Sequence, residues 1–243
     1  MSFASSQPDR LPSAGNLARP EGLEPPAYRF EVCRSIQLSY GRVLSHYSRQ
    51  WDNRNRMTSD AVETEVKLPV EDTGEAALRL EEAGFTVSHP RELESNSLYD
   101  LPDQRLRRAG MALRLRQAGE RSIITWKGPI EAGPYKIRPE LETTVGSVTV
   151  VADILTRLGY ELIFRYEKFR TEFRRPEARG SIVLDETPIG AFLELEGPGD
   201  WIDKTAMELG FTSASYVLDS YVSLYIKHCE EKGRQPKHML FSS

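Results

Sequence analysis

Charged side chains recur at every second position in several short stretches of the sequence. Between Val62 and Leu68, glutamate and lysine alternate with mainly apolar residues. Because successive side chains of a β-strand point to opposite faces, this period of two predicts strands with one charged face. The bases on such faces are Lys67, Arg114, Arg116, Lys127, Arg138, Lys168 and Arg170, and the acids are Glu63, Glu65, Glu140, Glu142, Asp185, Glu194 and Glu196.

The arrangement of these faces has two possible interpretations. An open antiparallel sheet with one solvated face is the ordinary one. A solvated face, however, usually mixes neutral polar residues with isolated charges, whereas several of these strands carry two or three charges in succession. We therefore expect the charged faces to turn inward and the apolar faces to lie outside under helices, which requires a closed barrel with an ionic interior.

The balance of charge indicates what such an interior would bind. Buried charges are costly unless they are paired or bound to a ligand. Seven bases against seven acids are neutral, so a triphosphate with roughly three to four negative charges would need about two divalent cations. Carboxylates are ligands that Mg²⁺ or Mn²⁺ prefers, and Arg and Lys bind phosphate. A polyphosphate or nucleotide sensor without catalysis is the less favoured alternative, because a pure anion binder gains nothing from seven carboxylates.

Helices are expected between the strands, which makes the fold class α+β. Apolar spacing predicts helices over residues 72–83 and 148–158, and a third over 200–209 with Asp200 as its N-cap. Each of these segments is followed by glycine and then an aromatic residue, which is typical of a helix end. A last helix is expected from about Ser215 to Lys232, where Tyr216, Tyr221 and Tyr225 recur at helical spacing and are interpreted as packing residues.

Composition excludes several classes of protein. The 243 residues are 39% hydrophobic and contain no apolar run of the length that crosses a bilayer, so a soluble protein without a membrane partner is expected. The two cysteines, Cys33 and Cys229, fit neither a disulfide framework nor a metal knuckle, and a cytoplasmic location follows as the default. The net charge of −4 argues weakly against nucleic acid as a partner.

The first 56 residues differ in composition from the remainder. They carry eight arginines and five acids with no lysine, and they show neither helical nor alternating periodicity. Part of this stretch resembles the translated antisense strand of a transfer-RNA gene, so we expect residues 1–56 to be spurious and Met57 to be the start. A real but disordered extension is the alternative. The expected domain covers residues 57–232, and residues 233–243 form a C-terminal tail.

Seven motifs in order resemble those of a known family. The sequence ETEVK at residues 63–67 resembles the ExExK signature of the CYTH superfamily, the triphosphate tunnel metalloenzymes. It is followed by LYD ending at Asp100, ALRLR ending at Arg116, ITWKGP around Lys127, RPELE from Arg138, EKFR ending at Arg170 and LDETPIGAFLELEG from Leu184. The resemblance covers essentially all of the chain beyond Val62, and it implies an antiparallel tunnel of eight strands.

The resemblance also implies roles for the charged residues. Glu63, Glu65, Glu194 and Glu196 correspond to metal ligands, and Asp185, Glu140 and Glu142 to further acidic contributors. The seven bases correspond to the residues that bind the triphosphate. No histidine is expected on these strands, since His89 is interpreted as a loop residue, so metal would activate the attacking oxygen while Glu65 or Lys67 handles the proton.

Two reactions would use this machinery. TWKGP followed by RPELE is more similar to class IV adenylyl cyclases, which convert ATP to cyclic AMP and pyrophosphate. The alternative is a triphosphatase that hydrolyses thiamine triphosphate, inorganic triphosphate or a nucleoside triphosphate. Trp126 is a candidate for stacking on a base, but its alternation with Lys127 points it outward, and we interpret it as a packing residue.

Overall fold

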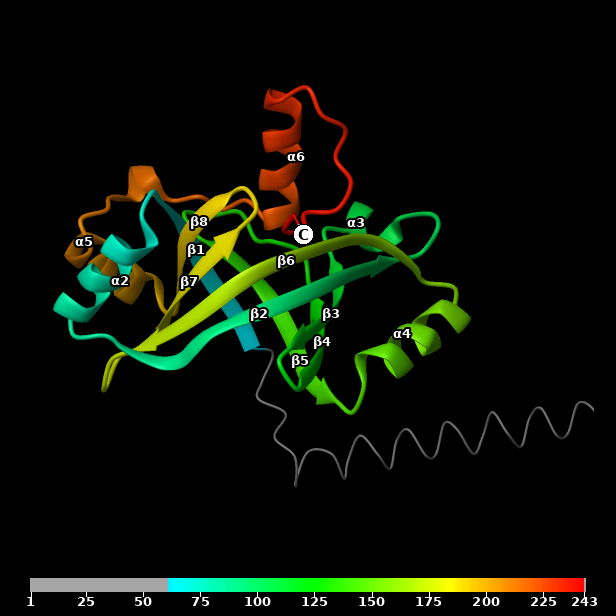
Figure 1. Cartoon of the computed structure of the whole chain (residues 1–243), viewed down its shortest axis with the longest axis horizontal. Helices are drawn as coiled ribbons and strands as arrows, with labels where there is room; N and C mark the ends of the chain where they lie inside the picture. The colour runs from blue at the N-terminus through cyan, green and yellow to red at the C-terminus, as the bar shows by residue number, and fades with distance from the viewer. Residues whose placement is uncertain (1–60, 243) are drawn as a thin grey trace, which may run out of the picture. The chain divides into compact units, whose positions relative to one another are not determined.

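A computed structural model describes residues 61–242, and in it eight antiparallel strands close into a barrel (Figure 1). The order around the barrel is β1-β5-β4-β3-β2-β6-β7-β8. The closed eight-stranded barrel expected from the sequence is therefore confirmed, while residues 1–56 lie outside the described part of the chain. The strands are β1 (Ala61–Val70), β2 (Thr86–Asp100), β3 (Ala112–Ala118), β4 (Arg121–Lys127), β5 (Lys136–Val145), β6 (Glu161–Arg174), β7 (Ser181–Thr187) and β8 (Gly190–Glu196).

Helices cover the outside of the barrel. They are α2 (Thr73–Glu82), α3 (Arg105–Arg108), α4 (Val148–Arg157), α5 (Gly199–Glu208) and α6 (Tyr221–Glu231), with a 3₁₀ turn at Ser213–Ser215. The predicted glycine-aromatic helix ends are present. After α2, Gly84 has a φ of 81° and the Phe85 amide donates to the Leu80 carbonyl, which satisfies an end carbonyl. None of the helices in residues 61–242 has the length and apolar character needed to cross a bilayer.

Helix α5 begins differently from the sequence expectation. Pro198, not Asp200, is its N-cap, and the Pro198 carbonyl accepts hydrogen bonds from the amides of Trp201 and Ile202. Asp200 lies in the first turn, where a negative charge still interacts favourably with the positive end of the helix dipole. The backbone turn at Gly197 and Pro198 thus starts the helix earlier than the capping pattern predicted.

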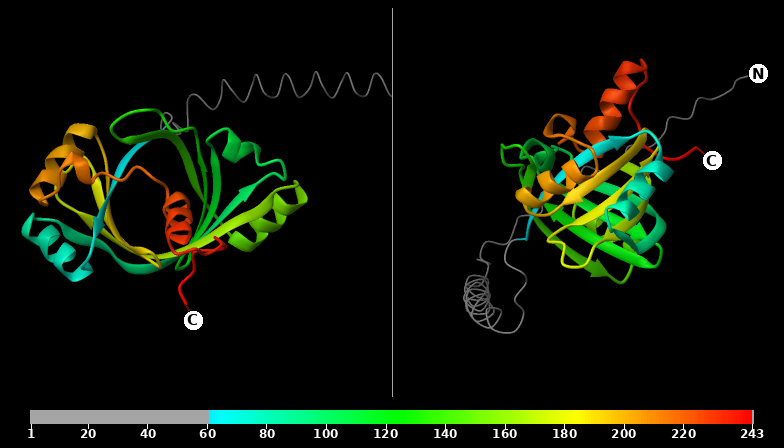
Figure 2. Two further views of the ribbon diagram at one scale, coloured as in Figure 1. Left: turned by 90° about the horizontal axis from the view of Figure 1, so that it is seen from above. Right: turned by 90° about the vertical axis from the view of Figure 1, so that its left-hand side faces the viewer.

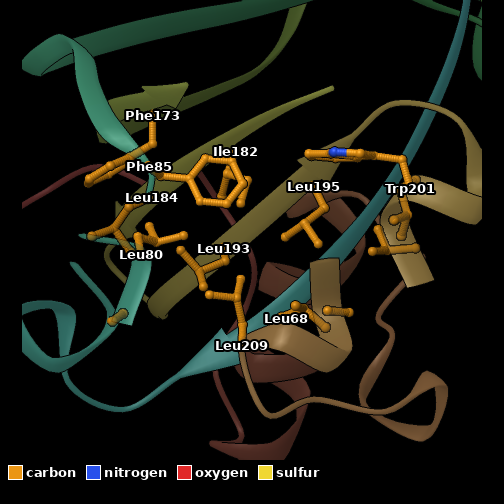
Figure 3. Close-up of a cluster of buried hydrophobic side chains, with 14 residues drawn as sticks. Leu68, Leu80, Phe85, Phe173, Ile182, Leu184, Leu193, Leu195, Trp201 and Leu209 are labelled. Carbon is orange, nitrogen blue, oxygen red and sulfur yellow. The ribbon is translucent and has the colours of Figure 1, made fainter. Parts of the chain in front are cut away.

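The main hydrophobic core lies outside the barrel wall, between the strands β1, β7 and β8 and the helices α2 and α5 (Figure 3). Leu68 and Leu195 are fully buried on the outer face of the sheet, against helix residues such as Leu80 and Ile202. Burying each such side chain contributes about 1.5–3 kcal/mol. The apolar faces therefore point outward under helices, as expected, which leaves the charged faces to line the lumen.

The C-terminal part of the chain covers one end of the barrel. Helix α6 stands over this end in two views (Figures 1 and 2). Val217 exchanges two backbone hydrogen bonds with Lys67 of β1, which holds the chain extended and delays α6 to Tyr221 instead of the predicted Ser215. Met239 is fully buried and bonds through its backbone to Arg165 and Glu167 of β6, so residues after 232 pack on the barrel.

Candidate active site

All fourteen charged residues singled out from the sequence face the lumen. Residues opposite each other in an antiparallel pair lie on the same side of the sheet. Glu63 lies opposite Arg138, and Glu65 lies opposite Glu196 on the other neighbouring strand. The same relation carries the inner face through β4, β3, β2, β6 and β7 back to β8. The predicted residues are thus brought together on one surface.

Two further charged residues belong to this surface and were missed. Lys136 lies opposite Glu65, and Glu94 lies opposite Lys168; both are buried. Lys136 could have been found by extending the alternation from Arg138 back by two residues. Glu94 was missed because serine and asparagine follow it in the strand, so no further charge continues the alternating pattern. The additions raise this set from seven bases and seven acids to eight of each, so the set stays neutral.

Lysine side chains lie between pairs of carboxylates on one side of the lumen. Lys127 Nζ lies 2.7 Å from Glu63 Oε1 and 2.8 Å from Glu140 Oε2. Lys67 Nζ lies 2.8 Å from Glu65 Oε1 and 3.2 Å from Glu194 Oε1. In each case one ammonium group occupies the place between two carboxylates where a cation is electrostatically favoured.

The opposite side of the lumen has the reverse arrangement, with carboxylates held among bases. Asp185 is fully buried and accepts hydrogen bonds from Lys168 Nζ at 2.6 Å and from Arg170 Nε at 2.7 Å. Glu94 pairs with Arg116 at 3.1 Å and with Lys168 at 3.6 Å. These bases are therefore fixed in position by buried acids before any substrate is present.

The two sides are named here by their excess charge. The acidic wall comprises β8, β1 and β5, which carry six acids and three bases on the inner face, a net charge of −3. The basic wall comprises β3, β2, β6 and β7, which contribute four bases and two acids to the same set of sixteen residues, a net charge of +2, while Glu92 and Glu172 share this inner face outside the set. Lys127 on β4 lies between them and completes the neutral total.

The pKa values of individual side chains depend on their nearest charged neighbours. In the acidic wall, burial together with the nearby Glu63 and Glu65 raises the pKa of Glu196 to about 7, although its carboxylate remains accessible to solvent. In the basic wall, the pKa of Glu94 falls to about 2, because the nearby bases, Arg170 first among them, outweigh the opposing effect of burial. Burial and the neighbouring Lys67 lower the pKa of Lys136 to about 8.

The acidic wall fits a divalent cation in the chemistry of its side chains. Glu196 forms no ion pair with any residue between 61 and 242, and its raised pKa reflects carboxylates crowded without enough positive charge. No three acidic or histidine side chains in the described residues already converge as a ligand set. This is consistent with the position of the lysines, which lie between the carboxylates that a metal would join.

Two sequence interpretations concern the surroundings of the site. His89 was expected in a loop, but it lies in β2, where its Nε2 is 3.2 Å from Glu92 Oε2. The strand is irregular on both sides of His89, because the pairing register with β6 shifts there, and this irregularity gave the loop-like pattern. Trp126 is half-buried and alternates with the buried Thr125 and Lys127, so it does lie outside the lumen, as predicted.

Comparison with known proteins agrees with the fold and the lumen. The chain belongs to the CYTH family, since the model of the CYTH domain matches residues 61–217. This family of triphosphate-binding barrels generally depends on a divalent metal. The match indicates an enzyme of this general kind.

Individual proteins are similar in sequence or in structure. A "putative adenylate cyclase" of Methanocaldococcus jannaschii is 26% identical over 135 residues, which are 56% of this chain and 76% of that protein. The structure of a "putative adenylate cyclase" from Vibrio parahaemolyticus matches with a TM-score of 0.61 and 22% identity, over 68% of this chain and 98% of that one. A protein of Pyrococcus horikoshii OT3 matches with a TM-score of 0.59 and 24% identity, over 68% of this chain and 99% of its own.

Proposed function

We propose that the chain is a metal-dependent phosphoryl-transfer enzyme that converts ATP to cyclic AMP and pyrophosphate inside the barrel. The observation that carries this proposal is the division of the lumen into an acidic and a basic wall. A triphosphate needs several fixed bases, and a metal that accompanies it needs grouped carboxylates. The sequence motifs within residues 125–142 and the name of the Methanocaldococcus jannaschii relative favour the cyclase reaction.

The basic wall would bind the phosphate groups. Arg170 is held by Asp185 through Nε at 2.7 Å and Nη2 at 2.6 Å, so its guanidinium is oriented in advance. Arg116 and Lys168 form single ion pairs with Glu94, at 3.1 Å and 3.6 Å, and Arg116 Nε also donates a hydrogen bond to Asn96 Oδ1. Bases that need no reorganisation stabilise the charge that develops on phosphoryl oxygens during the reaction.

The acidic wall would hold Mg²⁺ or Mn²⁺. Glu63, Glu65, Glu140, Glu194 and Glu196 are the residues proposed to bind it, with the half-exposed Glu142 at the edge of this group. Such a metal, when bound, neutralises phosphate charge and lowers the pKa of a coordinated hydroxyl or water. The ammonium groups of Lys67 and Lys127 would then pair with phosphate oxygens in place of the carboxylates between which they now lie.

Lys67 and Glu65 have different parts in this scheme. The pKa of Lys67 is raised, because the attraction of Glu194 and Glu65 outweighs burial, so Lys67 remains a cation that stabilises phosphate charge. The pKa of Glu65 lies well below its ordinary value, because Lys67 and Lys136 outweigh the effect of burial. Glu65 therefore stays ionised, and we propose it as a carboxylate that binds metal; its low pKa makes it a weak acceptor for the proton of the attacking oxygen.

The test is to incubate the full chain with ATP, thiamine triphosphate and inorganic triphosphate, each with Mg²⁺ or Mn²⁺, and to separate the products. Cyclic AMP and pyrophosphate from ATP are the expected result. Orthophosphate from any of the three substrates, without cyclic AMP, would instead establish the triphosphatase. Tight binding of all three without turnover would show a polyphosphate-binding module and overturn the enzymatic proposal.

A further inference from the structure

Helix α6 brings one polar side chain into the end of the lumen. Tyr221 is the first residue of this helix, whose N-cap Ser220 accepts a hydrogen bond from the Ser223 amide. Only 6% of Tyr221 is exposed. Its hydroxyl donates a hydrogen bond of 2.8 Å to Asp185 Oδ2 on β7, so a side chain from outside the barrel contacts the carboxylate that holds the basic wall.

The ring of Tyr221 lies close to two bases of the lumen. Lys67 Nζ and Lys168 Nζ lie 5.2 Å and 5.0 Å from the ring centroid, within the range of cation–π attraction. On its apolar side the ring packs edge-on against Phe192 at 5.6 Å between centroids. The residue therefore closes the charged part of the lumen while its hydroxyl reaches Asp185.

Asp185 already accepts four hydrogen bonds, three on Oδ2 and one on Oδ1. Its two oxygens receive hydrogen bonds from Lys168, from two nitrogens of Arg170 and from Tyr221, and the residue is fully buried. A carboxylate bonded to four donors has little capacity left for a metal. This differs from the acidic role that the family resemblance implies for Asp185, and it suits a residue that orients its neighbours.

We propose that Tyr221 is a positioning residue for the triphosphate site, acting through Asp185 on Lys168 and Arg170. The inference rests on the proposed function, since it assigns to α6 a part in the binding of the same substrate. Without the phenol, Asp185 loses one of its four donors, and the two bases lose part of the restraint on their geometry. The C-terminal helix thereby contributes to phosphate affinity without contacting the substrate.

The matched pair of variants is Tyr221→Phe and Tyr225→Phe. Both lie on α6 and both lose only a hydroxyl, but the hydroxyl of Tyr225 donates to the His238 carbonyl at 3.0 Å, away from the lumen. For Tyr221→Phe we expect the Kd of inorganic triphosphate by calorimetry, and the KM of the active substrate, to rise about tenfold, because a hydrogen bond to a charged group is lost. We expect kcat to change less than threefold, and Tyr225→Phe to match the wild type in all three.

The same measurements in an Asp185→Asn background separate positioning from packing. If Tyr221 acts through Asp185, adding Tyr221→Phe to Asp185→Asn should change the Kd less than twofold. A full tenfold effect in that background, or an unchanged Kd in the single variant, would overturn the inference. Wild-type protein that binds and converts no triphosphate would instead overturn the proposed function. Circular dichroism shows whether each variant is folded. If Tyr221→Phe is not folded, the Kd is measured in Tyr221→Trp, which also removes the hydroxyl contact with Asp185.

Discussion

The two walls of the lumen are built from the same kind of strand, yet each contains an acidic side chain whose pKa is shifted opposite to that of its counterpart in the other wall. Glu196 in the acidic wall has a pKa of about 7, whereas Glu94 in the basic wall has a pKa of about 2. In both cases burial favours the neutral form, and the sign of the neighbouring charges decides the outcome. The charges nearest to each carboxyl group, and not burial alone, therefore set its state; Glu65, in the acidic wall, stays ionised because Lys67 and Lys136 lie beside it.

This difference separates two tasks within one barrel. At the edge of the acidic wall, Lys127 lies between Glu63 and Glu140 and is a cation that a metal could replace. In the basic wall, Asp185 and Glu94 are anions that no substrate needs to displace, because they hold the bases from the side. The acidic wall is thus suited to recruiting metal for the chemical step, and the basic wall to binding phosphate.

The largest expected effect is that of Glu65→Gln in the acidic wall. We expect kcat with Mg²⁺ or Mn²⁺ to fall about 10²–10³-fold, the usual loss when one preorganised electrostatic group is removed. Binding of inorganic triphosphate without metal should persist, since the bases of the other wall are unchanged. Glu186→Gln is the control, because Glu186 lies outside the lumen in an ion pair with Arg91. Equal loss of metal-free binding in Glu65→Gln would show that the two walls do not have separate tasks.

In the basic wall, Arg170→Lys should change binding more than chemistry. Lysine cannot reproduce the two hydrogen bonds that Arg170 donates to Asp185 at 2.7 and 2.6 Å. We expect the KM of the active substrate to rise about 10–100-fold from the loss of charge-assisted bonds, with a smaller change in kcat. Arg165→Lys, on the exposed outer face of the same strand, should leave both constants unchanged. A loss confined to kcat would contradict the assignment.

A smaller effect concerns the stability of the metal-free chain. The folded pKa of Glu196, about 7, lies above its ordinary value of 4.5, so the native state binds the proton more tightly than the unfolded state does. Stability from this group therefore falls as pH rises from about 4.5 to 7. With EDTA present, Glu196→Gln should melt about 2–4 °C higher than the wild type above pH 7, which corresponds to about 1 kcal/mol after discounting for solvent exposure.

Melting curves collected between pH 4 and pH 8 check this prediction. The two proteins should have the same melting temperature near pH 4.5, where the carboxyl group is protonated in both states. Adding Mg²⁺ should stabilise the wild type more than Glu196→Gln, because only the wild type offers this carboxylate. A constant difference at every pH would mean that Glu196 titrates normally and that the acidic wall is not crowded with negative charge.

The sequence predicted the barrel because several charges in succession on one strand face favoured closure over an open sheet, and because the family resemblance implies a tunnel of eight strands. It also predicted which residues line the lumen, since alternate residues of a strand point to opposite faces of the sheet. The start of α6 was wrong because the extended backbone at Val217 is set by pairing with Lys67, which lies 150 residues away in the chain. Such long-range pairing leaves no local signal.

The contacts between particular side chains could not be predicted from the sequence either. Tyr221 shows helical spacing that is typical of a packing residue, and it does pack, but its hydroxyl bond to Asp185 depends on how α6 docks on the barrel. The excess of charge on each wall likewise required the strand order, because neighbours around the barrel, such as β1 and β8, are distant in sequence. The division into two walls therefore emerges only from the closed structure.

The smallest expected effect is that of Trp126→Phe, which compares the inside of the barrel with its outside. Trp126 lies on β4 opposite Leu113 and Leu141, on the face away from the lumen. A base that stacked on its ring would be bound more tightly by about 1–3 kcal/mol, so loss of the indole would raise the KM of ATP several-fold. We expect instead that the KM of ATP, relative to that of inorganic triphosphate, stays within about twofold of wild type. A selective loss for ATP would place the nucleoside outside the lumen, and the two walls would then bind only its phosphates.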